Sequence, residues 1–189
     1  MQDVLAGRAL RTFFKRARWV LALLLLAPLA WFMDPRRLPL ALAVSLVGQL
    51  VQTWCFAALV KNRELTVRGP YLLVRNPMYL GRYLLILGFV LLVDGAWAVA
   101  LYTAGYVAYM VSRVRREEQR LERHFGDAYR AYCGAVRRFV PSFRGLADPH
   151  VWCFDRAMFL ENNAHWNILL TLGAFAAAWG LHVALQARG

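Results

Sequence analysis

The feature that constrains this chain most is an apolar run over residues 38–60 that contains no charged side chain. A helix of about 23 residues is long enough to cross the hydrocarbon core of a bilayer, which needs about 20. Its few polar side chains, Gln49, Gln52 and Thr53, are expected to face other helices rather than lipid. The run therefore predicts a transmembrane helix, and it restricts the fold to structures that a membrane tolerates.

Other apolar runs predict further crossings. Residues 19–33 follow a long basic stretch, and we expect a retained first helix rather than a cleaved secretory signal, because more membrane segments follow. Residues 83–93 and 96–111 are separated only by an Asp-Gly pair, which is typical of the tip of an antiparallel helical hairpin. Residues 166–185 form a last apolar helix. The predicted fold is an all-α integral membrane bundle of about five transmembrane helices.

Small residues recur at helical spacing in two of these runs. Such residues allow membrane helices to approach closely. We expect two close-packed faces, one formed by Ala100, Ala104 and Ala108 and the other by Gly173, Ala177 and Gly180.

The basic residues predict the orientation. Of the 23 Lys and Arg residues, 20 lie in residues 1–18, 61–82 and 113–156. The positive-inside bias therefore places these segments in the cytoplasm and the carboxyl terminus outside, as expected for a multi-pass protein of a bacterial inner membrane. A net charge of +12 also suits nucleic acid binding, but no soluble domain remains to carry such a surface.

Cysteine and histidine residues do not indicate a metal site or a disulfide framework. The three cysteines are odd in number, widely separated and without C-x-x-C spacing. The four histidines have no acidic or thiol partners at ligand spacing, and we expect His124 to be a solvated surface residue. No metal is predicted.

A polar loop, GPYLLVRNPMYLGR over residues 69–82, separates two apolar runs. Its two prolines predict a turn-rich connection with a fixed path. Arginine, asparagine and two tyrosines then provide a cation, an amide and amphipathic rings, which suit a polar ligand at a membrane surface. The alternative is an ordinary cytoplasmic loop with basic residues for topology and tyrosines for the interface.

Residues 112–144 form a charged segment in which apolar residues return at helical intervals. This pattern predicts a helix that ends at Pro141. Arg113 and Glu117 share one face of it, and Glu118 lies about 100° around the axis. Both this helix and the loop adjoin the same hairpin, so they are expected to meet and form a cytoplasmic pocket. A solvated helix with surface ion pairs is the alternative. Residues 152–159 suggest an interfacial stretch.

Two patterns, in order across the hairpin, resemble the superfamily of isoprenylcysteine carboxyl methyltransferases and phospholipid methyltransferases. The loop is similar to the family pattern G-x-Y-x-x-x-R-H-P-x-Y-x-G. Residues 117–141 contain EEQRL, FGDAYRAY and RFVP, which match E-E-x-x-L, F-G-x-x-Y-x-x-Y and R-F-x-P. The resemblance covers about residues 63–141 of a single domain. Residues 19–60 supply amino-terminal helices, and residues 142–189 add an interfacial segment and an extra helix.

The resemblance implies an integral membrane methyltransferase that uses S-adenosylmethionine and acts on a lipid or isoprenoid-type acceptor. By matching position, it assigns catalytic roles to Arg113, which orients the acceptor, and Glu117. The cofactor-binding residues that it implies are Glu64, Leu65, Thr66, Tyr71, Arg75, Asn76, Pro77, Tyr79, Gly81, Glu117 and Glu118. Asn76 departs from the family histidine, and its amide can hold polar atoms but cannot act as a base near neutral pH.

Methyl transfer from a sulfonium is an in-line displacement, for which an enzyme supplies alignment and exclusion of water. A carboxylate acceptor needs no base and would be oriented by Arg113, whereas an amine must lose a proton, for which Glu117 is suited. The sequence therefore leaves both a carboxylate and an amine open as the acceptor. Two other classes also stay open: a NADPH-dependent sterol-type reductase, whose Y-G-x-x-W-x-x-Y-C run resembles residues 125–133, and a non-catalytic membrane scaffold.

Overall fold

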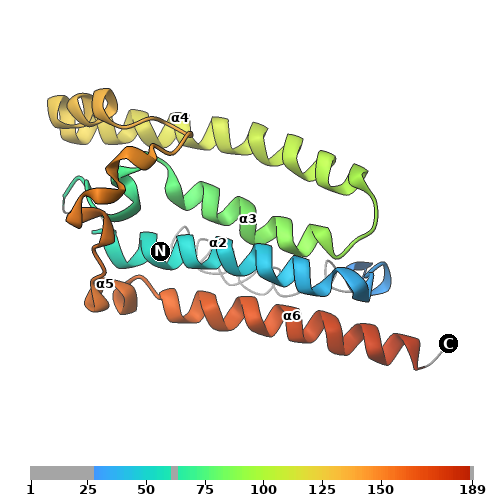
Figure 1. Cartoon of the computed structure of the whole chain (residues 1–189). Helices are drawn as coiled ribbons and strands as arrows, with labels where there is room; N and C mark the ends of the chain where they lie inside the picture. Colours follow the sequence, from blue (N-terminus) through green and yellow to red (C-terminus); the bar gives the residue numbers. More distant parts are fainter. Residues whose placement is uncertain (1–27, 61–63, 188–189) are drawn as a thin grey trace, which may run out of the picture.

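The computed structural model describes residues 28–60 and 64–187, and their regular secondary structure is helical throughout. Four long helices carry the fold of this part (Figure 1): α2 (Leu38–Ala58), α3 (Pro77–Leu91), α4 (Ala96–Ala135) and α6 (Ala164–Gln186). The short elements are η1 (Pro35–Arg37), η2 (Gly69–Leu72), η3 (Phe143–Ala147), η4 (Pro149–Trp152) and α5 (Arg156–Glu161). The prediction of an all-α fold is confirmed for these residues.

Two segments of the described chain are long and apolar enough to cross a membrane, Pro35–Ala58 and Ala164–Gln186. They correspond to the predicted crossings over residues 38–60 and 166–185. Helix α3 is apolar but shorter. The predicted helix over residues 19–33 and the basic stretch before it lie outside the described residues, except for residues 28–33. The arrangement with five crossings stays a prediction.

Helices α2 and α3 form the closest contact of the bundle. A Cβ atom on Gly48 would overlap the backbone nitrogen of Leu85, and one on Gly88 would overlap the backbone oxygen of Ala41. The Ser45 hydroxyl donates a hydrogen bond of 2.6 Å to the Leu85 carbonyl. The absence of side chains therefore lets the two backbones touch, as is common for helices packed in a membrane.

In the part of the chain that the structure describes, the two faces of small residues predicted for close packing are not used in this way, so that prediction was wrong. The alanine face of α4 and the glycine-containing face of α6 are both exposed. Helix α4 instead meets α3 through tyrosine rings, such as Tyr83 stacked on Tyr102 with centroids 5.4 Å apart. Helix α6 contacts its neighbours through larger side chains. The Thr171 hydroxyl donates a hydrogen bond to Gln49 of α2, and the Phe175 ring stacks on Phe89 of α3.

Two predicted boundaries also differ from the structure. Helix α3 begins at Pro77, so the loop ends at Asn76 and its last six residues are helical. Proline is well tolerated there because the first helical residues have no partner for an N–H donor. The second hairpin helix and the charged helix are one element, the 40-residue α4, which bends at Gly126, where the backbone has φ 54° and ψ −123°.

Candidate functional site

A cavity of about 680 Å³ lies where the end of α2, the start of α3 and the polar half of α4 meet. Its size falls within the range of small-molecule sites. The residues that line it are Phe56, Leu59, Val60, Glu64, Leu65, Thr66, Tyr71, Arg75, Asn76, Met78, Tyr79, Arg82, Tyr109, Arg113, Glu117, Arg120, Leu121, His124, Phe125, Tyr129 and Tyr132.

Most of the residues assigned to the site by sequence line this cavity, and three do not. Pro77 begins α3. Gly81 lies against Gln52 and Gly48 of α2, where a Cβ atom would be 3.0 Å from the Gly48 carbonyl oxygen. Glu118 is buried in a polar network outside the cavity lining. Pro77 therefore belongs to the start of α3, and Gly81 to the contact between α2 and α3, rather than to the cavity wall.

One face of α4 supplies half of the charged side chains in the cavity lining. Arg113, Glu117, Arg120 and His124 follow one another at intervals of three or four residues, which places them in a row on one side of a helix. The Tyr79 hydroxyl of α3 donates a hydrogen bond of 2.8 Å to the Glu117 carboxylate. Sequence reasoning missed Arg120, although its helical phase relative to Glu117 was a usable signal. His124 was predicted to be a solvated surface residue, and it is exposed while it also lines the cavity.

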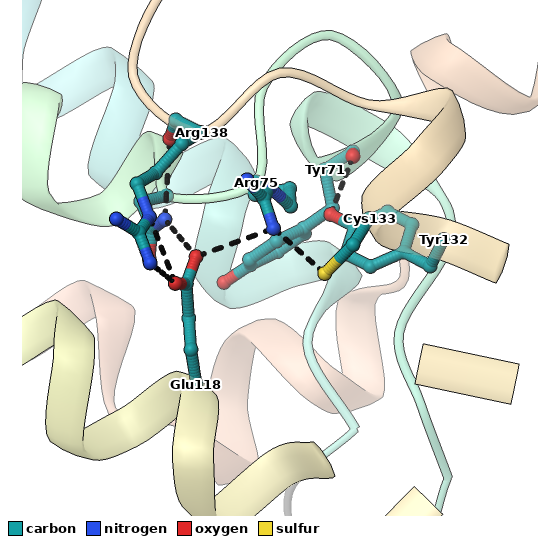
Figure 2. A network of polar contacts seen from close by, with 7 residues as sticks. Tyr71, Arg75, Glu118, Tyr132, Cys133 and Arg138 are labelled. Carbon is teal, nitrogen blue, oxygen red and sulfur yellow. Dashed lines mark hydrogen bonds and ion pairs between the residues drawn. The ribbon is translucent and has the colours of Figure 1, made fainter. Parts of the chain in front are cut away.

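Glu118 holds together three segments that are distant in sequence (Figure 2). Its carboxylate accepts from Arg138 through Nε at 2.8 Å and through a second guanidinium nitrogen. It lies 3.6 Å from Arg75 Nη1 and accepts from Asn76 Nδ2 at 3.4 Å. We call these four residues, Glu118, Arg75, Asn76 and Arg138, the Glu118 clamp. The hydrogen bond to Glu118 raises the pKa of Arg138, so this cation stays charged.

The clamp belongs to a larger contact between the loop and the chain beyond the bend at Gly126. The backbone nitrogen of Arg75 donates to the Arg137 carbonyl at 2.9 Å, and the Tyr132 hydroxyl donates to the Tyr71 carbonyl at 2.8 Å. Arg75 Nη1 also lies 2.6 Å from the Cys133 sulfur. Figure 2 shows these side chains converging between the loop and the end of α4. The bend at Gly126 thus brings the following residues back to the loop, where Tyr129 and Tyr132 line the cavity.

The cavity contains more cations than anions. Among the described residues, Arg82, Arg113 and Arg120 form no ion pair within 4 Å, and Glu117 contacts a neutral tyrosine. Burial raises the pKa of Tyr71 and of Tyr132, so both hydroxyls are neutral hydrogen-bonding groups at physiological pH. The site therefore suits a polar ligand with at least one anionic group.

Among the described residues, the fold and this site define an all-helical protein with two helices long and apolar enough to cross a membrane and a polar cavity where α2, α3 and α4 meet. Residues 38–128 match the model of the phospholipid methyltransferase family. The match agrees with the superfamily of membrane methyltransferases that the two motifs predicted, and this family implies methyl transfer. The matched segment spans α2, α3 and α4 to just beyond the bend. Comparisons with curated proteins and with solved structures gave no match.

Proposed function

We propose that this protein transfers a methyl group from S-adenosylmethionine to a lipid or isoprenoid-type acceptor at the cytoplasmic surface of the membrane. The observation that carries the proposal is the placement of Glu117 and Arg113, one helical turn apart, on the wall of the cavity inside the segment that matches the family. The Glu117 carboxylate suits a cationic ligand and the Arg113 guanidinium an anionic ligand, so the wall offers adjacent places for two reactants.

The chemistry of the cavity fits the cofactor. S-adenosylmethionine carries an ammonium group, a carboxylate, a ribose and an adenine ring, and it supplies a methyl group on a sulfonium. Glu117 and Glu64 offer carboxylates to its cationic and hydroxyl groups, and the rings of Tyr71, Phe125 and Tyr129 offer aromatic surface. In this proposal the Glu118 clamp holds Arg75 and Asn76 at the wall, while Glu118 itself acts from behind it.

The acceptor end is assigned to Arg113 and Arg82. Both line the cavity, and they come from the two helices of the apolar hairpin, α4 and α3. Because the cofactor has a net positive charge, unpaired arginines beside it are better explained by an anionic group on the second reactant. Arg113 would orient that group by a charge-assisted hydrogen bond.

A phospholipid amine is the second candidate acceptor, and the description of the matching family favours it. In this case Arg113 and Arg82 would hold the lipid phosphate, while Glu117 is suited to take the proton that the amine must lose. A carboxylate acceptor needs no base. The two candidates therefore differ in pH dependence, because only the amine should be methylated faster as pH rises through its pKa.

Thermal unfolding of the purified full chain with different ligands tests the cofactor. A ligand that binds only the folded state raises the melting temperature. We expect stabilisation by S-adenosylmethionine and S-adenosylhomocysteine and none by NADPH. Stabilisation by NADPH alone would favour a reductase, and no response to any of the three would favour a scaffold. Mass spectrometry of lipids incubated with the protein and labelled cofactor then identifies the acceptor.

A further inference from the structure

The carboxyl end of α2 is capped by Arg68 and by two residues from the far end of the chain, Asp155 and Asn162. The last carbonyls of a helix have no partner within the helix and need one from elsewhere. Asn162 Nδ2 donates to the carbonyls of Phe56 and Leu59, at 2.8 and 2.9 Å. The Asp155 backbone nitrogen donates to Ala57 at 3.1 Å, and Arg68 Nε donates to Ala58 at 3.0 Å.

The capped turn is also a wall of the cavity. Phe56, Leu59 and Val60 line it, and the Val60 backbone nitrogen donates to the Thr66 hydroxyl at 3.2 Å. Thr66 lines the cavity as well. The position of this wall therefore depends on the partners that hold the last carbonyls of α2.

Two of the three capping residues, Asp155 and Asn162, lie outside the segment that matches the family, which ends at residue 128. These two residues flank α5 (Figure 1), where the chain passes the end of α2 before it enters α6. Asn162 is buried, with 6% of its surface exposed, and it joins two carbonyls that are three residues apart. This buried amide therefore uses both of its donor hydrogens to hold the end of α2.

We propose that Asn162 is a positioning residue for the cofactor, which acts by fixing the wall formed by Phe56, Leu59 and Val60. This inference rests on the proposed function, because it assigns that wall to the cofactor side of the cavity. Under this proposal, the carboxyl-terminal segment holds the cofactor side of the cavity in place. The acceptor side, built from Arg82 and Arg113, does not depend on it.

The substitution Asn162→Asp tests the proposal because it keeps the size of the side chain and removes both donors. An ionised aspartate also places its charge against two carbonyl oxygens. Loss of these hydrogen bonds should weaken S-adenosylhomocysteine binding about tenfold at pH 8. Burial and the facing carbonyls raise the pKa of such a carboxyl, and its protonated form regains one O–H donor. Affinity relative to wild type should therefore recover towards pH 5.5.

Asn163→Asp is the matched control. Asn163 is exposed and has φ 58°, a left-handed conformation that aspartate also tolerates. This variant should bind like wild type at both pH values. In Asn162→Asp, the Michaelis constant for the acceptor should stay unchanged while that for the cofactor rises. Unchanged cofactor affinity, or equal loss for both substrates without recovery at low pH, would overturn the proposal.

Hydrogen exchange of residues 56–60 provides a readout that does not need a ligand. Faster exchange is expected in Asn162→Asp than in wild type or in Asn163→Asp, because the capped turn loses two hydrogen bonds. If wild type fails to bind S-adenosylhomocysteine, the proposed function fails while this measurement still tests the cap. If Asn162→Asp does not fold at pH 8, Asn162→Ala is measured in the same way. Exchange equal to wild type in the substituted protein would overturn the capping role.

Discussion

Glu117 and Glu118 are consecutive residues of α4, yet they belong to two different regions. Glu117 lies on the cavity wall and accepts one hydrogen bond from Tyr79. Glu118 lies in the clamp, where its side chain is 10% exposed and two arginines and an amide surround it. Because successive helical residues point about 100° apart, one pair of glutamates can serve a ligand and the fold at once.

The largest effect is expected from Glu118→Ala, which breaks the clamp. Removal of one member of a buried ion pair leaves the other charge uncompensated, and the side chain of Arg75 is only 15% exposed. We expect a loss of about 3 kcal/mol in the free energy of unfolding. Denaturant unfolding in detergent measures it.

Glu122→Ala is the control for the clamp, because Glu122 pairs with Arg130 at 3.0 Å on the exposed side of the same helix. That variant should lose no more than about 1 kcal/mol. Equal losses in the two variants would show that the clamp is no stronger than a surface pair, and the contrast between the two regions would disappear.

Glu117→Gln should affect binding rather than folding. The glutamine keeps the shape and can still accept from Tyr79, but it loses the charge that a cationic ligand needs. We expect affinity for S-adenosylmethionine to fall about ten- to a hundredfold, a cost of roughly 1.5–3 kcal/mol, with unchanged unfolding. Titration calorimetry checks the affinity. Normal affinity would remove Glu117 from the cofactor site.

Arg113→Lys separates the two acceptor classes. Lysine keeps the charge but not the planar pair of donors that holds a carboxylate, so turnover of a carboxylate acceptor should fall about tenfold, with cofactor affinity unchanged. Arg116→Lys is the control, because Arg116 lies on the same helix and does not line the cavity. Near-normal turnover in Arg113→Lys, together with methylated phosphatidylethanolamine among the products, would favour the amine acceptor.

The smallest effect is expected from Pro77→Gly at the start of α3. Glycine gives the unfolded chain more conformations, which should lower the free energy of unfolding by about 0.4–1 kcal/mol. Cofactor affinity should change little, because Pro77 does not line the cavity. A larger loss of affinity than in Glu117→Gln would show that the path of the loop, rather than the Glu117 charge, determines binding.

Sequence patterns predicted the helices well because apolar runs and helical periodicity are local properties. Residues 38–60 and 166–185 correspond closely to α2 and α6. The motifs also brought the loop and α4 together correctly around one cavity. Local patterns failed for packing partners: the alanines of α4 have helical spacing, but the close contact uses Gly48, Gly81 and Gly88, whose neighbours come from another helix.

Long-range contacts explain most of what the sequence did not reveal about the site. Nothing near Glu118 in the chain indicates that its partner is Arg138, 20 residues later. The same holds for Asn162, which caps a helix that ends more than 100 residues before it. Helical phase did contain information about Arg120, which lies one turn after Glu117 on the same face of α4 and lines the cavity.

The bend at Gly126 has a consequence for handedness. A Cβ atom built on Gly126 would meet nothing within 4 Å, so space does not require glycine there, whereas a positive φ does. Its angles are close to the mirror image of the extended conformation that L-residues prefer. A D-alanine at this position should therefore preserve the bend, while an L-alanine should straighten the helix and withdraw Tyr132 from the loop. A D-residue at this one position would separate backbone shape from side-chain packing as the cause of the contact between Tyr132 and the loop.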